Sequence, residues 1–247
     1  MKIEENLKSI GEKMCQEGHL ADVRIGLGYT CVELQDGAAG IAWTPTRSAG
    51  SSCTHIAKAG TMQNFSELEA INLLSSSSDF ERAIGLATFN AVNSRQKRDY
   101  SDAEAISALN IQPTDSVVMV GHFAPLLPRI KKTGCTFHVI DLDSAKPGIT
   151  DLSEGPDLLA QCDVAILTAT SIINGTIDDL LSQLKRNRAA VLLGPSSPAC
   201  PEAFRDSRIT QLSGSMVTDV EPLKRVISQG GGTMLLKKYV KFVNMFV

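Results

Sequence analysis

Four short apolar runs in the second half of the chain limit its possible folds more than any other feature of the sequence. Each is too short for a helix and too continuous for a strand with one exposed face, which is typical of a parallel strand covered on both faces. The runs are Val117–Val120, Phe137–Ile140, Val164–Leu167 and Val191–Leu193. Helical patterns separate several of them, at Leu126–Lys132, Ile177–Leu184 and Pro222–Ile227. Because a parallel connection crosses over the sheet and a helix packs that crossing, the pattern predicts a doubly wound, mostly parallel α/β sheet.

The first half of the chain has different periods. Its first apolar residues fall on one helical stripe from Ile3 to Met14, and Gly18 follows as a stop. From Val23 to Cys31 apolar and polar residues alternate, which predicts one strand with a covered face. A turn at 35–40 and a second strand at 41–44 complete a predicted β-hairpin.

Helix-capping patterns divide the rest of the first half. Ser66-Glu-Leu-Glu69 is a capping box, and Asp79 is expected to cap a second helix that runs to about Val92. The chain then turns polar and basic, and Ser101-Asp-Ala-Glu104 is expected to cap a further helix. We therefore predict a domain boundary near residue 98, with domains at 1–98 and 99–247.

Composition narrows the partners and the compartment. The 247 residues carry 24 basic and 27 acidic side chains, so the chain lacks the broad positive field that attracts nucleic acids. No apolar stretch approaches the roughly 20 residues of a membrane span, and the first residues open a charged amphipathic helix rather than a signal peptide. We expect a cytoplasmic protein whose partner is a small molecule, neither nucleic acid nor membrane. The sequence leaves self-association to a homo-oligomer open.

The cysteines do not form a recognisable metal or redox motif. All six lie far apart, without a Cys-x-x-Cys pair, so neither a zinc ribbon nor a redox dithiol is predicted. Cys53-Thr-His55 is a weak metal pattern because it lacks two further ligands. No metal is therefore expected to be held directly by protein side chains.

Ligands of doubly wound sheets bind at the carboxyl ends of the strands, which directs attention to the residues that follow each run. After the first run, Gly121 permits a tight turn, and the following helix would offer its amino terminus to a carboxylate or phosphate. The Gly-x-Gly-x-x-Gly loop of dinucleotide enzymes is missing, which makes NAD a minority option.

Asp141 lies 20 positions after Gly121, where nucleotide-binding folds place an acid against ribose hydroxyls. A loop cap explains Asp141 equally well.

The third strand end, Thr168–Thr176, offers more hydrogen-bonding groups than one turn requires. Ligand contact by Asn174 and Thr176 is slightly favoured over a plain turn in which Thr176 caps the next helix. The fourth, Gly194–Pro201, has three prolines and is expected to be a stiff loop that presents Ser196 and Ser197. No histidine–acid pair can be tied to either serine, so a nucleophile is not inferred.

Three other polar residues are candidates. Asp219 is expected near a fifth strand end, with capping of the next helix as the alternative. Asn90 lies on the small-residue face of its helix, where a buried amide must be hydrogen-bonded, either inside its own domain or across the seam to a ligand. His122 has the chemistry of a general acid or base, although a lone histidine is more often structural.

Taken together, these landmarks resemble a known family. Their order along nearly the whole chain resembles the family known as "putative heavy-metal chelation". The segments that carry the resemblance are Ala59-Gly-Thr61, Glu81-Arg-Ala-Ile-Gly-Leu-Ala-Thr-Phe-Asn90-Ala, Val120-Gly-His-Phe-Ala-Pro125, Thr168-Ala-Thr-Ser-Ile-Ile-Asn-Gly-Thr176, Leu193-Gly-Pro-Ser196 and Val217-Thr-Asp219.

The resemblance implies an enolase amino-terminal-like α+β domain followed by a Rossmann-like domain, with a site in the cleft between them. It also implies a link to metal chelation through a small molecule such as a pterin, flavin or siderophore-like compound. By the same resemblance, the cleft is lined by Asn90, Gly121, Phe123, Asn174, Thr176, Ser196 and Asp219. His122 stands where the family would be expected to have an aromatic residue, so the resemblance gives it no role.

Three functions follow as hypotheses. The first is an enzyme that condenses or hydrolyses a small heteroaromatic or metal-chelating metabolite, with Asp141, Asp219 and His122 moving protons. The second is a non-catalytic binding protein for a metal chelate. The third, which rests on Gly121 and Asp141 alone, is an adenosine-cofactor methyltransferase that binds S-adenosylmethionine. The cofactor candidates are accordingly a metal chelate and a nucleotide-like or pterin-like small molecule.

Overall fold

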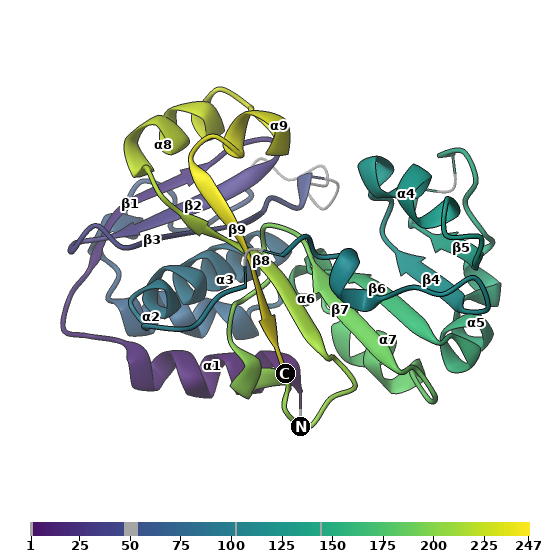
Figure 1. Ribbon diagram of the computed structural model, residues 1–247. Helices are drawn as coiled ribbons and strands as arrows, with labels where there is room; N and C mark the ends of the chain where they lie inside the picture. The colour runs from purple at the N-terminus through teal and green to yellow at the C-terminus, as the bar shows by residue number, and fades with distance from the viewer. Residues whose placement is uncertain (1, 47–53, 102, 144) are drawn as a thin grey trace.

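The computed structural model describes residues 2–46, 54–101, 103–143 and 145–247 (Figure 1). Within these residues the strands form a small antiparallel sheet and a larger, mostly parallel one. The first part of the chain contains α1 (Ile3–Met14), β1 (Leu20–Ile25), β2 (Tyr29–Leu34), β3 (Ala39–Trp43), the 3-10 helix η2 (Met62–Asn64), α2 (Glu67–Asn72), η3 (Leu73–Ser75) and α3 (Asp79–Ser94).

The second part supplies the larger sheet and its connections. Its elements are η4 (Ser107–Leu109), β4 (Ser116–Val120), η5 (Ala124–Leu126), α4 (Leu127–Lys131), β5 (Thr136–Ile140), η6 (Leu152–Glu154), α5 (Gly155–Gln161), β6 (Val164–Thr168), α6 (Thr170–Ile173), α7 (Ile177–Gln183), β7 (Ala189–Leu193), η7 (Pro201–Phe204), β8 (Gln211–Val217), α8 (Val220–Ser228), α9 (Thr233–Leu236) and β9 (Val240–Phe246). The predicted mixed α/β class is thus confirmed.

The six-stranded sheet has the order β5-β4-β6-β7-β8-β9. All neighbours from β5 to β8 are parallel, as the apolar runs predict, and β9 is an antiparallel edge strand that the sequence did not reveal. Alternate residues of each central strand enter different cores: Met119 packs with Ile130 of α4, while Val118 packs with Leu159 of α5. The sheet is therefore covered on both faces.

The three-stranded sheet, β1-β2-β3, is also covered on both faces. Val32 and Leu34 pack with α1, α2 and α3, whereas Cys31 and Ile41 pack with Leu223 of α8. The chain thus leaves the large sheet after β8, lays α8 and α9 on the small sheet, and returns as β9, which Figure 1 shows in yellow.

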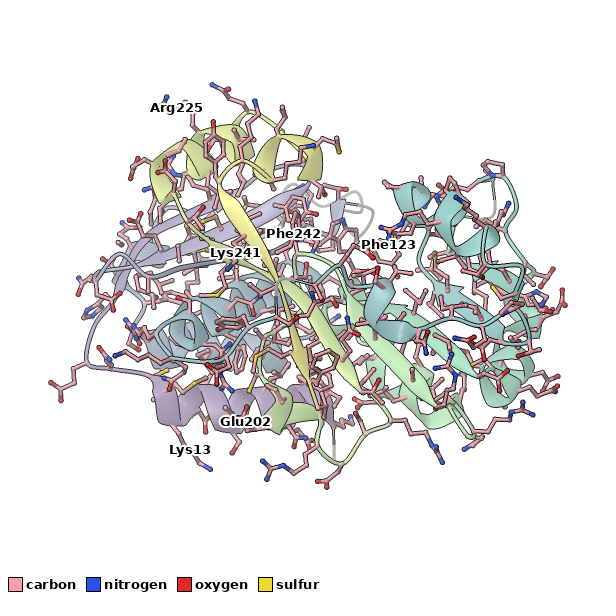
Figure 2. All side chains as sticks on the ribbon, viewed as in Figure 1. Lys13, Phe123, Glu202, Arg225, Lys241 and Phe242 are labelled. Atoms are coloured by element: carbon pink, nitrogen blue, oxygen red, sulfur yellow. The ribbon has the colours of Figure 1, made fainter. Side chains whose placement is uncertain are left out.

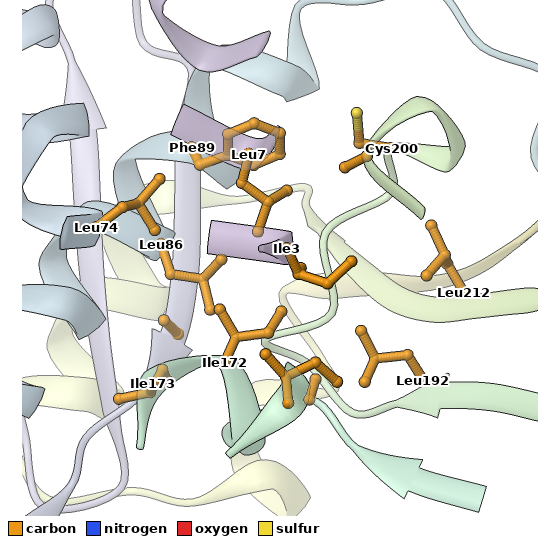
Figure 3. Close-up of a cluster of buried hydrophobic side chains, with 14 of the residues drawn as sticks. Ile3, Leu7, Leu74, Leu86, Phe89, Ile172, Ile173, Leu192, Cys200 and Leu212 are labelled. Atoms are coloured by element: carbon orange, nitrogen blue, oxygen red, sulfur yellow. The ribbon is translucent and has the colours of Figure 1, made fainter. Parts of the chain in front are cut away.

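One apolar core joins the two sheets. Figure 3 shows Leu7 of α1 and Phe89 of α3 in the same cluster as Ile172 of α6 and Leu192 of β7. This cluster contains residues from both predicted domains, and the boundary near residue 98 stays a prediction.

Two predicted elements are wrong. The single strand over Val23–Cys31 is broken by a turn, in which the Gly26 N–H donates to the Tyr29 carbonyl at 2.9 Å. A Cβ on Gly26 would lie 2.1 Å from the carbonyl oxygen of Ile227, so α8 packs directly onto this turn. The helix expected after Ser101 is also absent from the described residues, where only the short η4 forms; Ser101 instead bridges to Asn244 of β9.

Other local predictions are confirmed. The Ser66 capping box forms in both directions at the start of α2. The second hairpin strand is present as β3. The helix expected at 79–92 is α3, although its N-cap is Ser78 and Asp79 is its first residue. No helix in the described part of the chain is both long and apolar enough to cross a bilayer.

Candidate functional site

The carboxyl end of β4 depends on a glycine. Gly121 has a φ of +94°, and a Cβ there would lie 2.8 Å from Cβ of Thr168 at the end of β6. Both the backbone conformation and the space therefore require glycine. The Phe123 ring closes over the same point, with Cε2 3.5 Å from the position of that Cβ.

Asp141, at the end of β5, is held by its own protein. Its carboxylate accepts the N–H of His122 at 2.8 Å and the N–H of Asp143 at 2.8 Å, and Lys146 Nζ lies 3.0 Å from both oxygens. Burial alone would raise the pKa of Asp141, but these hydrogen bonds and Lys146 outweigh it and hold the pKa below its usual value. The carboxylate is thus charged at neutral pH and ties the ends of β4 and β5 together.

This geometry bears on the anion seat expected after β4. The segment that follows is a three-residue 3-10 helix and a five-residue α-helix, not one long helix. The His122 N–H, which precedes this segment, is taken by the carboxylate of Asp141. Within the segment, Pro125 has no N–H and the Leu126 N–H donates to the Phe123 carbonyl at 2.9 Å, so it is a poorer anion seat than the start of a long helix.

His122 and Phe123 are the two side chains of this turn that remain available. Nε2 of His122 is shielded from solvent and has no hydrogen-bond partner within the described part of the chain. Phe123 is half-buried and packs at the rim of the core around Ile130. A shielded ring nitrogen without a partner is uncommon, because burial removes its bond to water.

The end of β6 is a set of hydroxyls and amides that bond mostly to each other. Oγ1 of Thr168 lies 3.0 Å from Oγ1 of Thr170. Oδ1 of Asn174 accepts the hydroxyl and the N–H of Thr176, at 2.8 and 3.2 Å. Thr176 makes no side-chain cap to α7, so the capping role that was the alternative to ligand contact is wrong, and an Asx turn takes its place.

The loop after β7 does not present its serines to solvent. Ser196 and Ser197 are each 2% exposed. The Trp43 N–H donates to Oγ of Ser196 at 2.7 Å, and Ser197 Oγ donates to the Leu192 carbonyl at 3.1 Å. The prediction of a displayed serine loop is therefore wrong, because the first part of the β7–β8 connection packs against β3.

Asn90 crosses from the small-sheet lobe to this loop. Its amide nitrogen donates to the carbonyl of Ile41 at 2.9 Å and to that of Ser196 at 3.3 Å. A different residue of α3 contacts the segment before Asn174: Nε of Arg82 donates to the Ile173 carbonyl at 2.6 Å. Arg82 precedes Asn90 by eight residues on α3, or about 12 Å along the axis.

Asp219 follows β8 and is exposed. It occupies the N-cap position of α8 without a side-chain cap bond, and its N–H donates to the Tyr239 carbonyl at 3.4 Å. Its position after β8 agrees with the predicted fifth strand end, whereas the alternative, a side-chain cap to α8, does not form.

The predicted residues thus form three clusters along one edge of the sheet. Gly121, His122, Phe123 and Asp141 meet at β4 and β5, Asn174 and Thr176 share a turn after α6, and Asn90 meets Ser196. Sequence reasoning missed Lys146, which neutralises Asp141, and Trp43, which bonds to Ser196. The only signal for Lys146 was a base shortly after the two acids Asp141 and Asp143, and Trp43 could have been noticed as the single tryptophan at the end of a strand.

The donor set at this edge does not fit direct binding of a metal ion. Among the described residues no group of three or more His, Cys, Asp or Glu side chains lies together. Burial raises the pKa of Cys31 and of Cys200 to about 12, so these thiols are protonated at neutral pH. Of the weak Cys-x-His pattern, Cys53 lies outside the described residues, and the ring of His55 packs on Phe80 at a centroid distance of 5.8 Å.

The fold and these clusters define a mixed α/β protein in which a small antiparallel sheet adjoins the carboxyl edge of a mostly parallel one. Two family models match the chain, at residues 8–93 and 104–246, and both are described as "Putative heavy-metal chelation". The second model alone spans more than half of the chain. The chain therefore belongs to this heavy-metal chelation family.

Similar proteins extend this comparison. An uncharacterized protein of Methanocaldococcus jannaschii is 26% identical over 186 residues, which are 72% of this chain and 71% of that protein. A crystal structure of a protein of unknown function from Pyrococcus horikoshii has a TM-score of 0.86 and 22% identity, and covers all of both chains. One from Desulfitobacterium hafniense has a TM-score of 0.83 and 20% identity, and covers 99% of this chain and 98% of its own. At 22% and 20% identity, these two crystal structures support the fold of this chain alone.

Proposed function

We propose that the protein binds a small heteroaromatic, metal-chelating metabolite, of the pterin, flavin or siderophore-like kind, between its two lobes at the carboxyl edge of the large sheet. The metal would be carried by donors of the organic molecule. The observation that carries the proposal is the turn after β4, where a required glycine places Phe123 and a shielded, unpartnered His122 nitrogen beside the end of β6.

The topology supports this location. Numbered from β4, the large sheet has the order 2-1-3-4-5-6, which is the flavodoxin-like doubly wound order 2-1-3-4-5 with an added antiparallel strand, and we propose that this lobe is Rossmann-like in that broader sense. In such sheets ligands bind where the order reverses, which here is between β4 and β6. The small lobe, with α1 and a three-stranded sheet covered by α3, is proposed to be enolase amino-terminal-like and to supply β3 and Asn90 to the proposed interlobe site.

The side chains at the edge suit an organic ligand. Phe123 offers an aromatic face for a planar ring, and the hydroxyls of Thr168 and Thr170 are amphoteric hydrogen-bonding groups. Asp141, with both oxygens engaged, is proposed to position the turn rather than to hold ribose, which weakens the S-adenosylmethionine hypothesis. Calorimetry that detects S-adenosylmethionine binding would restore that hypothesis.

Catalysis is the second candidate, favoured by the free ring nitrogen of His122. Condensation and hydrolysis both need a group that moves a proton, and His122 and Asp219 are the proposed groups. Because Nε2 of His122 has no hydrogen-bond partner among the described residues, a ligand that reaches it after a ring rotation would pair that nitrogen.

The test uses three probes: pterin-6-carboxylate, riboflavin and the iron(III) complex of 2,3-dihydroxybenzoate. Native mass spectrometry and fluorescence quenching are expected to detect at least one of them with the intact protein. Phe123→Ala should weaken that binding about tenfold or more, which is the usual loss for a buried aromatic contact. Phe246→Ala is the matched control, because Phe246 pairs with Gln211 at the opposite, amino edge of the sheet.

The same proteins separate carriage from catalysis. If the bound probe is converted, His122→Gln should abolish turnover while binding persists; a retained, unconverted complex means carriage. Equal binding by Phe123→Ala, Phe246→Ala and the native protein would contradict the location of the site.

A further inference from the structure

Two adjoining hollows lie at the turn between β1 and β2, and none of the predicted site residues lines them. The larger has a volume of about 550 Å³, within the usual range for small-molecule sites. It is lined by Ile25, Gly26, Leu27, Thr44, Thr46, Phe80, Ser228, Gln229 and Gly230. The smaller, of about 260 Å³, is lined by Arg24, Glu221, Lys224, Arg225, Ser228 and Gln229. Because they share Ser228 and Gln229, the hollows adjoin, and we refer to them together as the groove.

We propose that this groove binds a small anionic amphipathic molecule, with an aromatic or aliphatic body in the larger hollow and an acid group in the smaller one. The proposal does not depend on the proposed function of the strand-end site, because it rests on different residues and a different part of the fold.

The larger hollow offers unusual apolar exposure. The Leu27 side chain, at the tip of the turn, is 73% exposed, and Ile25 is 38% exposed. Phe80, whose ring is braced by His55, forms another wall. Covering these side chains removes apolar surface from water, while the Thr46 hydroxyl can orient a polar edge of the ligand.

The smaller hollow is lined by three cationic side chains, Arg24, Lys224 and Arg225, and by one carboxylate, Glu221. Lys224 Nζ contacts Glu33 at 2.5 Å, Glu221 at 2.7 Å and Asp22 at 3.4 Å, so the nearby carboxylates are already engaged. Arg24 contacts Asp22 through its Nε, and the two terminal nitrogens of its guanidinium make no ion pair within the described part of the chain.

Arg225 completes the cationic end of the groove. It lies on the exposed side of α8, where Figure 2 shows it at the outer surface, and has no ion pair within the described residues. Two guanidinium groups with free donors therefore border the smaller hollow, and a carboxylate, sulfonate or phosphate suits this end.

The groove is built before any ligand binds. Gly26 packs against the carbonyl of Ile227, and a Cβ on Gly230 would lie 3.2 Å from Cδ1 of Leu27. The turn is thereby seated on the end of α8, so binding would cost little ordering of the backbone.

The test uses 8-anilinonaphthalene-1-sulfonate, an aromatic anion, and its neutral analogue N-phenyl-1-naphthylamine. Fluorescence titration of the intact protein is expected to give a dissociation constant for the anion on the order of 10–100 µM, and weaker binding of the neutral analogue. Leu27→Ser and Arg225→Gln should each weaken binding of the anion about fivefold or more. Raising the salt from 50 to 500 mM should reduce the difference between native protein and Arg225→Gln.

Matched controls come from exposed residues elsewhere. Leu68→Ser, on α2, replaces a leucine that is 46% exposed, and Arg129→Gln replaces an arginine on α4 with a 49% exposed side chain. Both should bind the anion like the native protein. Circular dichroism and urea unfolding confirm that each variant is folded. The proposal is overturned if the native protein does not bind the anion, or if the Leu27 and Arg225 variants bind it as tightly as the controls do.

Discussion

The Glu67 carboxylate shows how a single buried charge joins separate parts of the chain. It is 2% exposed, and Arg95, the C-cap residue of α3, approaches it with both terminal nitrogens, at 2.7 and 2.8 Å. Arg95 also donates from Nε to Asp36 in the β2–β3 turn at 2.7 Å, and the Gln16 N–H donates to Glu67 at 2.9 Å. This network ties α2, α3 and the hairpin, because a buried carboxylate must have its partners.

Arg95→Met should therefore lower the free energy of unfolding by about 3–5 kcal/mol, because it leaves Glu67 charged and buried without a cation. Urea unfolding measures the loss. Arg24→Met is the control. The Arg24 side chain is 51% exposed, and its ion pair with Asp22 is expected to contribute less than about 1 kcal/mol. Changing Glu67 to Gln in the Arg95→Met background should recover part of the stability. A loss as small as that of the control would show that the network is not important.

Close backbone contact positions β3 against α3. A Cβ on Gly40 would lie 2.2 Å from the carbonyl oxygen of Ala87 and 2.4 Å from the nitrogen of Ala91. The helix thus lies directly on the strand, and this approach brings Asn90 within reach of Ile41 and Ser196. A glycine in a strand is an ambiguous signal in sequence, because it also marks turns and bulges.

Gly40→Ala should push α3 away from β3 and cost about 2 kcal/mol or more, because the clashing atoms belong to backbone that cannot move freely. Gly232→Ala is the matched control: its Cβ would meet nothing within 4 Å, and its φ of −107° is ordinary. Thermal unfolding compares the two. Equal stability of both variants would mean that α3 and β3 tolerate a wider separation.

Ion pairs between distant segments give the whole protein a pH dependence. Hydrogen bonds from Arg188 hold the pKa of Asp115 below its usual value, and hydrogen bonds from Arg95 do the same for the pKa of Asp36. Burial would raise the pKa of Glu202, but Arg98 holds it down. A carboxyl whose pKa is lower in the folded state stabilises the fold above its unfolded pKa, and that stability is lost as pH falls through the folded pKa.

The free energy of unfolding should consequently change little from about pH 7 to 5 and fall steeply below about pH 4. Arg188→Met should return the pKa of Asp115 toward its usual value. The variant should then lose less stability than the native protein as the pH falls, so the two curves of unfolding free energy against pH converge at low pH. Urea unfolding at half-unit pH steps measures both curves. A constant difference between them down to pH 2 would contradict the role of this pair.

The sequence by itself determined the elements whose signals are local. The four apolar runs are β4 to β7, because a strand buried on both faces has apolar residues at successive positions. The Ser66 capping box formed as its spacing predicts. It also located Gly121 and Asp141 at neighbouring strand ends, because the carboxyl ends of parallel strands meet at one edge.

The tertiary structure decided which partner each polar residue has, and where a turn interrupts the alternating pattern of Val23–Cys31. Asp141 meets Lys146, Ser196 meets Trp43, and α8 packs on the turn that divides β1 from β2. These contacts arise from the way the elements pack together and not from the spacing of residues along the chain, so no local pattern encodes them. The physical reason is that apolar periodicity fixes which face of an element is buried, whereas the partner of a polar group depends on which other elements reach the same edge.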